Sequence, residues 1–328
     1  MIFTPNATYG KARTRAELHF TGGFRGFQQP EGWVIAPMLI DENLRAVGPF
    51  QLEEIRGIAR ELDVSILGIN ELSIMENQPE YQVWMDISAL GEGQGPSAAD
   101  LWSSISANAR RASEADYADL ASNIAASLRA ADIRIRDASH QYHIQLIPAL
   151  QRKQIAGRRF TNLAMADLFL AFHSLLVELC AARDYLAAIV ARHLGAGANV
   201  DSMAKLDGWT KRTANADTKD DVLVRELMED YKEQRWLAEL TEYRNRVLHR
   251  EPMGAGGIKR GAMLVELNTR MGSVQKLYLA IPAAFDADRT VDALGHLSSL
   301  HQKMQSLAKR ISMHALFPGK PIDVVVQR

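Results

Sequence analysis

The chain has 328 residues, of which 47% are hydrophobic and 23% are charged, a composition typical of a folded globular protein. Its 39 acidic and 38 basic side chains give a net charge of −1, so binding of nucleic acid would require a local basic patch. The single cysteine, Cys180, excludes an internal disulfide and a zinc site built on cysteines; within LLVELCAA it is expected to be a buried hydrophobic residue.

Residues 1–95 predict a small α+β module of unknown role, in which short apolar runs alternate with glycine and proline. Three strands and one helix are expected there, at 34–40, 64–69, 81–87 and 51–62. Residues 91–96, GEGQGP, are expected to be a linker, because nothing in them can hold a helix or a strand. They are not expected to form a phosphate-binding loop, because no Lys-Ser/Thr follows the glycines and no helix begins on them.

Residues 96–160 predict a helical connector that begins at Ser97, a residue suited to cap a helix. Within 132–150, apolar residues alternate with polar ones, which favours a short hairpin or an irregular crossover. His140 and His143 in this stretch resemble a metal pair, but three-residue spacing on a strand points the two side chains in opposite directions. We therefore expect no metal there.

Residues 161–328 predict a helical bundle with an inserted β-hairpin, so the fold class is α+β overall. His296 and His301, five residues apart on the last helix, are expected at its surface or rim. Residues 195–208 are expected to be a loop, residues 210–221 either a mobile connection or a solvated helix start, and residues 321–328 an edge strand. The expected helices are 162–194, 220–231, 234–250 and 288–314, and the hairpin joins 263–270 to 273–281.

The segment 236–249, WLAELTEYRNRVLH, carries an arginine, an amide and a histidine where its predicted helix ends. Arg244-Asn245-x-x-x-His249 in a late bundle helix resembles the signature of the HEPN domain family. The resemblance covers about 160–316. It implies an antiparallel helical bundle that pairs as a homodimer and acts as a metal-independent endoribonuclease without a cofactor, typical of toxin–antitoxin systems and antiviral defence.

The residue types of this motif suit RNA cleavage by the 2′-hydroxyl. His249 can exchange protons near pH 7 as general acid or base, and Arg244 can bind phosphate oxygens at two points. Asn245 lies four residues from His249 and can orient its imidazole. Arg244 is five residues away, about 140° around a regular α-helix, which predicts that the site is completed by the same helix of a second subunit.

Several further residues are expected to support this site. The resemblance implies an acidic partner for the motif arginine on the long helix, either Asp184, beside Arg183, or Glu178. Glu251 stands where members of the family controlled by a nucleotidyltransferase antitoxin often have tyrosine, so that control is not expected. Four basic residues near the motif either contact the RNA backbone or are ordinary solvated charges: Arg246, Arg250, Lys259 and Arg260.

Other interpretations of the motif remain open at this point. Arg244 can pair with Glu242 or another acid while His249 caps helix carbonyls. A HEPN-like dimer can also bind a nucleotide or a partner protein without catalysis, or the chain is an unrelated helical scaffold. If the nuclease is active, an antitoxin or regulatory protein is the expected partner. The N-terminus lacks a signal-peptide pattern and no apolar run is long enough to span a bilayer, so a cytoplasmic location is expected.

Overall fold

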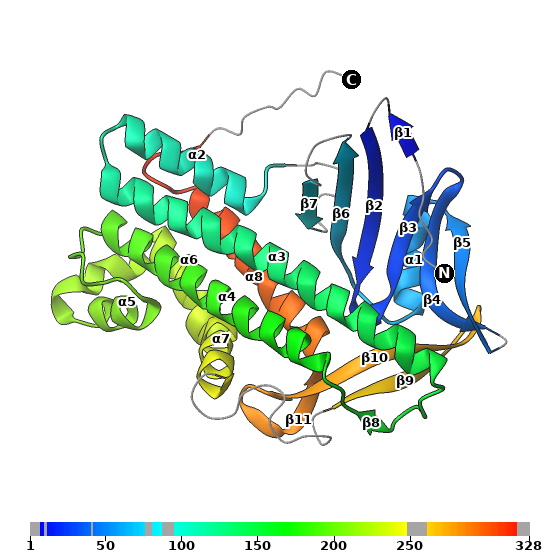
Figure 1. Ribbon diagram of the computed structural model, residues 1–328. Helices are drawn as coiled ribbons and strands as arrows, with labels where there is room; N and C mark the ends of the chain where they lie inside the picture. Colours follow the sequence, from blue (N-terminus) through cyan, green and yellow to red (C-terminus); the bar gives the residue numbers. More distant parts are fainter. Residues whose placement is uncertain are drawn as a thin grey trace. The chain divides into compact units, whose positions relative to one another are not determined.

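The structure, a computed structural model, describes residues 7–9, 12–40, 42–75, 81–86, 95–247 and 261–319 (Figure 1). The chain divides into two compact units, each assembled from three segments. Unit 1 consists of Met1–Gln94, Asp132–Phe172 and Pro252–Ser298, and unit 2 consists of Gly95–Ala131, His173–Glu251 and Ser299–Arg328. Along the sequence, the chain alternates between the two units.

Unit 1 contains a seven-stranded antiparallel sheet with the strand order β5-β4-β3-β2-β6-β7, and β1 pairs with β2. The expected strands at 34–40, 64–69 and 81–87 are confirmed. Four further strands, β1, β2, β3 and β5, were not expected. The strands are β1 (Ala7–Tyr9), β2 (Ala12–Phe20), β3 (Arg25–Gln29), β4 (Gly32–Ile40), β5 (Asn43–Phe50), β6 (Ile66–Met75) and β7 (Tyr81–Asp86).

The two faces of this sheet differ in chemistry. One face presents buried apolar side chains, including Leu18, Ile35 and Ile69. In the strand register, Leu18 lies opposite Ile69 on one side and Gly26 on the other, and Gly26 lies opposite Ile35. Figure 1 shows α1 (Leu52–Glu61), the expected helix, behind β3 and β4, and the C-terminal half of α3 in front of the strands. The face toward α3 carries charged and polar residues. A strand alternates its side chains between faces, so one sequence supplies both surfaces.

The helix α3 (Ala115–Gln151) runs without interruption through 132–150, so the expected hairpin or crossover was wrong. The apparent alternation included Ile133 and Ile144, which are 41% and 38% exposed. The residues that are buried in this stretch instead follow helical spacing: Ile135, Ala138, Tyr142, Leu146, Ala149 and Leu150. Two exposed apolar residues, Ile133 and Ile144, therefore obscured the helical period in the sequence.

Unit 1 also contains a second antiparallel sheet with the order β11-β10-β9-β8. Its central pair confirms the hairpin expected around Met271-Gly272. The last expected helix begins later than 288, because β11 precedes it and α8 spans Ala293–Ser312. The strands are β8 (Arg159–Phe160), β9 (Ala262–Thr269), β10 (Gly272–Ala283) and β11 (Asp286–Asp292). The expected edge strand at 321–328 lies outside the described residues.

Unit 2 is helical in its described residues. Trp102 of α2 donates a hydrogen bond from Nε1 to the carbonyl of Ala308 on α8 at 3.0 Å, and Arg310 forms ion pairs with Glu226 and Asp230, both at 2.6 Å. Residues 203–210, expected to be irregular, form α5 instead. The remaining helices are α2 (Ala98–Arg111), α4 (Met165–His193), α5 (Met203–Thr210), α6 (Val222–Met228) and α7 (Trp236–Asn245), with a 3-10 segment at Thr213–Asp220 and a π-helical segment at Glu229–Glu233.

The helix α4 is so apolar that its burial within the protein has to be compared with that of a membrane-spanning helix. By length and hydropathy it is the one helix among the described residues that could cross a membrane. Half of its most apolar 18-residue window is buried within the protein, including Leu175, Leu176 and Leu179, all 1% exposed or less. This burial is typical of the core helix of a folded domain, in agreement with the expectation of a central buried helix. The α+β fold class is confirmed.

Candidate functional site

The motif segment begins as the helix α7, whose buried side chains are Trp236, Leu237, Leu240 and Tyr243. Their spacing of one, three and three residues buries one face of the helix in unit 2. Arg235 precedes the helix with a positive φ of 59°, which marks a sharp turn into it. This arrangement fixes the orientation of α7 and places Arg244 and Asn245 of the motif in its last turn.

Arg244 is half-buried, and its Nε atom is buried without a hydrogen-bond partner. Arg244 forms no ion pair within the described residues. Glu242, the acidic residue nearest to it in the sequence, pairs instead with Arg246 at 4.0 Å. Arg246 also lies over the Tyr243 ring, 5.9 Å from its centroid. The pairing of Arg244 with Glu242 that a purely structural role would favour is therefore not observed.

Arg244 lies close enough to Cys180 of α4 for its charge to influence the thiol. Burial raises the pKa of Cys180, and the positive charges of Arg183 and Arg244 act in the opposite direction. The thiol contacts the carbonyl of Leu240 at 3.7 Å and is 2% exposed. Cys180 is thus a buried core residue, as expected, and not a nucleophile.

Arg246 and Val247 adopt a π-helical turn immediately after α7. A π-turn closes hydrogen bonds between residues five apart, whereas an α-helix closes them between residues four apart. Residues five apart therefore come to the same side of a π-turn, unlike the offset of about 140° expected for a regular helix. His249, Arg250, Lys259 and Arg260 lie outside the described residues, so the structure does not place the motif histidine beside Arg244.

Of the three residues on α4 expected to support the motif, Arg183 and Asp184 are engaged elsewhere. Asp184 pairs with its neighbour Arg183 at 2.9 Å and accepts a hydrogen bond from the backbone of Met203 at 3.2 Å. Arg183 is 5% exposed and also donates to Thr241 of α7. Glu178 is half-buried and forms no ion pair within the described residues. An acidic partner for Arg244 on α4 is therefore not seen, and Arg183 and Asp184 instead tie α4 to α5 and α7.

The histidines outside the motif are placed differently from the sequence expectation. His140 and His143 lie on the helix α3, where a spacing of three residues puts them on the same side. His301 is 3% exposed, 3.3 Å from Gln305, so its expected surface position was wrong. His296 is partly buried. Within the described residues, no three His, Cys, Asp or Glu side chains are arranged to hold a metal ion.

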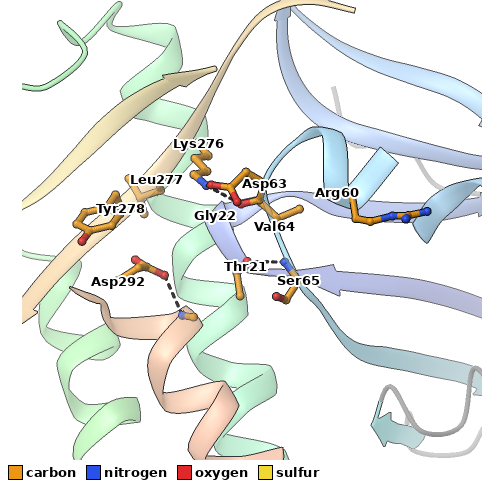
Figure 2. Close-up of a pocket in the computed structure, with 11 residues that line it drawn as sticks. Thr21, Gly22, Arg60, Asp63, Val64, Ser65, Lys276, Leu277, Tyr278 and Asp292 are labelled. Carbon is orange, nitrogen blue, oxygen red and sulfur yellow. Dashed lines mark hydrogen bonds and ion pairs between the residues drawn. The ribbon is translucent and has the colours of Figure 1, made fainter. Parts of the chain in front are cut away.

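A pocket of about 400 Å³ opens within unit 1 beside β10 and the 3-10 turn Thr21–Gly23 (Figure 2). Several of its polar groups already have partners. Lys276 Nζ contacts Asp63 Oδ2 at 2.6 Å, and the backbone N–H of Ser65 donates to Thr21 Oγ1 at 2.9 Å. A ligand in this pocket would have to displace these contacts, so the pocket is a weak candidate for a binding site.

At the inner end of this pocket, Asp292 is held by three hydrogen bonds, from Leu279 N at 3.1 Å, Tyr142 Oη at 3.0 Å and Gly295 N at 2.8 Å. Tyr142 Oη also accepts a hydrogen bond from Leu294 N at 3.2 Å. We call these two side chains and the first turn of α8 the Asp292 corner. Burial raises the pKa of Asp292. All of these hydrogen bonds join groups of the protein to one another, and two of them involve the first turn of α8. The corner therefore has a structural role, which is to fix the start of α8.

The sequence analysis missed a second group of buried polar residues in unit 1, centred on His19 and Arg25. The signal was present in residues 15–20, RAELHF, where charged or polar and apolar residues alternate as they do in a strand with two different faces.

No family model matches the chain. Neither the curated proteins nor the solved structures contain a match.

Proposed function

We propose that this protein is a metal-independent endoribonuclease of the HEPN type that acts as a homodimer in the cytoplasm, as a toxin or an antiviral effector. The observation that carries the proposal is Arg244, a half-buried arginine in the last turn of α7 whose Nε has no partner. Burying a guanidinium without a counter-ion is costly, which favours a role in binding an anion such as the RNA phosphate.

The π-turn after α7 supports the same proposal. π-turns occur frequently at functional sites, and this one begins between the arginine and the histidine of the motif. If the turn continues to His249, Arg244 and His249 of one chain face the same phosphate, with Asn245 beside them. Homodimerisation is then supported by the family resemblance rather than required by helix geometry, and the two arrangements can be separated by experiment.

Cleavage of RNA by the purified full-length protein in EDTA tests the catalytic assignment. We expect His249→Ala to lower the rate by about 10²–10⁴-fold, because proton transfer is lost. Arg244→Ala is expected to lower it by about 10²–10³-fold, through loss of charge stabilisation at the phosphate. The control is Arg225→Ala, an exposed arginine of α6 in the same unit. Unchanged cleavage in both motif variants would contradict the proposal.

A mixing experiment distinguishes a site within one chain from a site shared between chains. Arg244→Ala and His249→Ala proteins are unfolded together, refolded and assayed. If each site takes its arginine from one subunit and its histidine from the other, mixed dimers contain one intact site and activity returns. If both residues come from the same chain, activity stays low. A protein that sediments as a monomer and still cleaves RNA would refute the homodimer.

Absence of cleavage in a dimer would favour the non-catalytic alternative, in which the paired helices bind a nucleotide or a partner protein. An active nuclease in the cytoplasm would require an antitoxin or regulatory protein to restrain it. The His249→Ala protein lacks the proposed activity and should not harm the cell that produces it. Purifying this variant from that cell, together with the proteins bound to it, is the direct way to recover the partner. The bundle of unit 2 supplies the helical context that the HEPN proposal requires, but its finer HEPN-like layout is part of the proposal.

A further inference from the structure

One face of the seven-stranded sheet in unit 1 and the C-terminal half of α3 share a group of polar side chains, of which His19, Arg25 and Asn70 are buried. We call this group the polar layer. Both the sheet and residues 132–151 of α3 belong to unit 1, so the layer lies within one compact unit. Its members are Glu17 and His19 on β2, Arg25 on β3, Asn70 on β6, Trp84 on β7, and Arg136, His140 and His143 on α3.

The register of the strands brings these residues together. His19 lies opposite Arg25 on one side and Gly68 on the other. Asn70 lies opposite Trp84. A Cβ atom at Gly68 would be 2.7 Å from the Trp84 indole, so only glycine leaves room for this ring. The indole can therefore approach His19, with the ring centroids 4.9 Å apart.

The side chains from α3 complete the layer from above. Arg25 donates to Glu17 at 2.7 Å and to Nδ1 of His140 at 2.9 Å. Because a guanidinium only donates, His140 accepts at Nδ1 and carries its proton on Nε2. His143 Nδ1 lies 2.9 Å from the carbonyl of Gly23, which only accepts, so that nitrogen carries the proton. With the His140 lone pair engaged by Arg25, the three histidines do not form a metal site.

Four residues of the layer contain buried atoms without a hydrogen-bond partner. They are both ring nitrogens of His19, Nε of Arg25, Oδ1 of Asn70 and Nε1 of Trp84. His19 is 1% exposed and Arg25 is 4% exposed. Buried polar atoms nearly always have partners in folded proteins, so a concentration of unpaired ones around one ring makes this group a candidate to bind a polar ligand. These atoms are not accessible to solvent, so a ligand must displace neighbouring side chains to reach them.

The charge balance of the layer identifies the kind of group. The Glu17 carboxylate is shared by Arg25 at 2.7 Å and Arg15 at 3.4 Å. Asp137 is likewise shared by Arg134 and Arg136, both at 3.0 Å. With Asp86, which lies opposite Gly68 on the same face, three carboxylates thus face four arginines. Burial lowers the pKa of His19, and the positive charge of Arg25 lowers it further, as expected in a region with excess positive charge.

We propose that the polar layer binds the phosphate group of a small molecule, either hydrogen phosphate itself or a phosphate monoester. Arg25 Nε, the His19 ring and Trp84 Nε1 donate hydrogen bonds to its oxygens. Asn70 Oδ1 accepts from a hydroxyl of the same ligand. Arg136 and Trp84 are only partly buried, so the ligand enters from their side of the layer. The proposal does not rest on the nuclease function, because the layer shares no residue with the motif.

Isothermal titration and thermal unfolding of the full chain with inorganic phosphate, AMP and sulfate test this site. Potassium chloride at matched ionic strength is the control for unspecific salt effects. We expect phosphate or AMP to raise the Tm in proportion to the logarithm of its concentration. Tighter binding of AMP identifies a phosphate monoester, and equal binding identifies free phosphate. Sulfate, which has no hydroxyl to donate to Asn70, should bind more weakly.

Two arginines on α3 provide matched variants. Arg136 and Arg134 both pair with Asp137, but only Arg136 reaches the sheet, where it donates to Gln82 at 2.9 Å. We expect Arg136→Gln to weaken phosphate binding by about tenfold or more, through loss of a charge-assisted contact. Arg134→Gln should leave binding unchanged. An equal effect of both variants would show general charge attraction and overturn the site.

His19→Phe removes both unpartnered nitrogens and keeps a ring of similar size. The site predicts a folded protein that no longer binds phosphate. If His19→Phe does not fold, the Arg136→Gln and Arg134→Gln pair still decides the outcome. A Tm that no oxyanion raises above the chloride control, together with a crystal structure that shows only water in the layer, would overturn the proposal.

Discussion

The Asp292 corner and the polar layer both bury charged side chains in unit 1, but they differ in how well these side chains are paired. In the corner, Asp292 accepts three hydrogen bonds and Tyr142 bridges to the first turn of α8. In the layer, His19 has no partner for either nitrogen. Fully paired buried groups stabilise a fold, whereas unpaired groups reduce its stability unless a ligand binds them. The comparison therefore separates a structural cluster from a candidate binding site.

The largest expected effect is on the Asp292 corner. Asp292→Ala leaves two backbone N–H groups and the Tyr142 hydroxyl without their acceptor, and we expect it to lower the free energy of unfolding by about 3–4 kcal/mol. Asp292→Asn, which keeps one acceptor oxygen, should cost less. The measurement is urea unfolding followed by circular dichroism. The exposed Asp288→Ala should change stability by less than about 0.5 kcal/mol. A similar small loss for Asp292→Ala would remove the distinction between the two clusters.

A pH effect of somewhat smaller size is expected from His143. Burial, followed by the charge of Arg25, lowers its pKa from 6.5 to about 4. The unfolded chain therefore binds a proton between pH 6.5 and 4 that the folded protein does not, and stability falls as the pH falls through this range. The expected contribution is about 2–3 kcal/mol. His143→Gln should flatten the stability profile in this range, and an unchanged profile would show that His143 is accessible.

Tyr142→Phe is expected to have an intermediate effect of about 1–2 kcal/mol on the free energy of unfolding. The hydroxyl both donates to Asp292 and accepts from Leu294 N, so its loss leaves one buried N–H unpaired. A double-mutant cycle of Tyr142→Phe with Asp292→Asn measures the coupling. Additive effects would mean that the two side chains do not act together.

The smallest expected change in stability is that of His19→Phe. It removes two buried atoms that lack partners, so the free energy of unfolding without ligand should change by less than about 1 kcal/mol or increase. The same urea unfolding measurement applies, with and without phosphate. A loss as large as that of Asp292→Ala would show that the layer is a paired structural core like the Asp292 corner.

The sequence predicted those elements whose local pattern agrees with their burial. The hairpin around Met271-Gly272, the apolar helix α4 and the helix α1 follow directly from period and turn residues. The strand β2 was not predicted, because charged and polar residues such as Glu17 and His19 interrupt its apolar positions. They lie beneath α3, and a sequence pattern does not distinguish solvent from a polar cover supplied more than a hundred residues later.

The candidate motif was visible in the sequence because it depends on residue types and spacing, but its geometry was not. A regular helix was assumed through residue 249, whereas the chain enters a π-turn at Arg246. Sequence patterns report helical periods near 3.6 residues and carry little information on single wider turns. The ion pair of Asp184 was also not predictable from the sequence. Asp184 pairs with Arg183, the residue directly before it, and not with Arg244.

The alternation of the chain between two units has a consequence for protein synthesis. The strands β1–β7 are complete by residue 94, but their cover on α3 begins at residue 132 and the strands β9–β11 follow residue 252. At roughly 5–20 residues per second, the ribosome delivers that last segment about 10–30 s after the first sheet. The sheet is therefore synthesised before α3, the helix that covers its polar face, and the second sheet of unit 1 is added last.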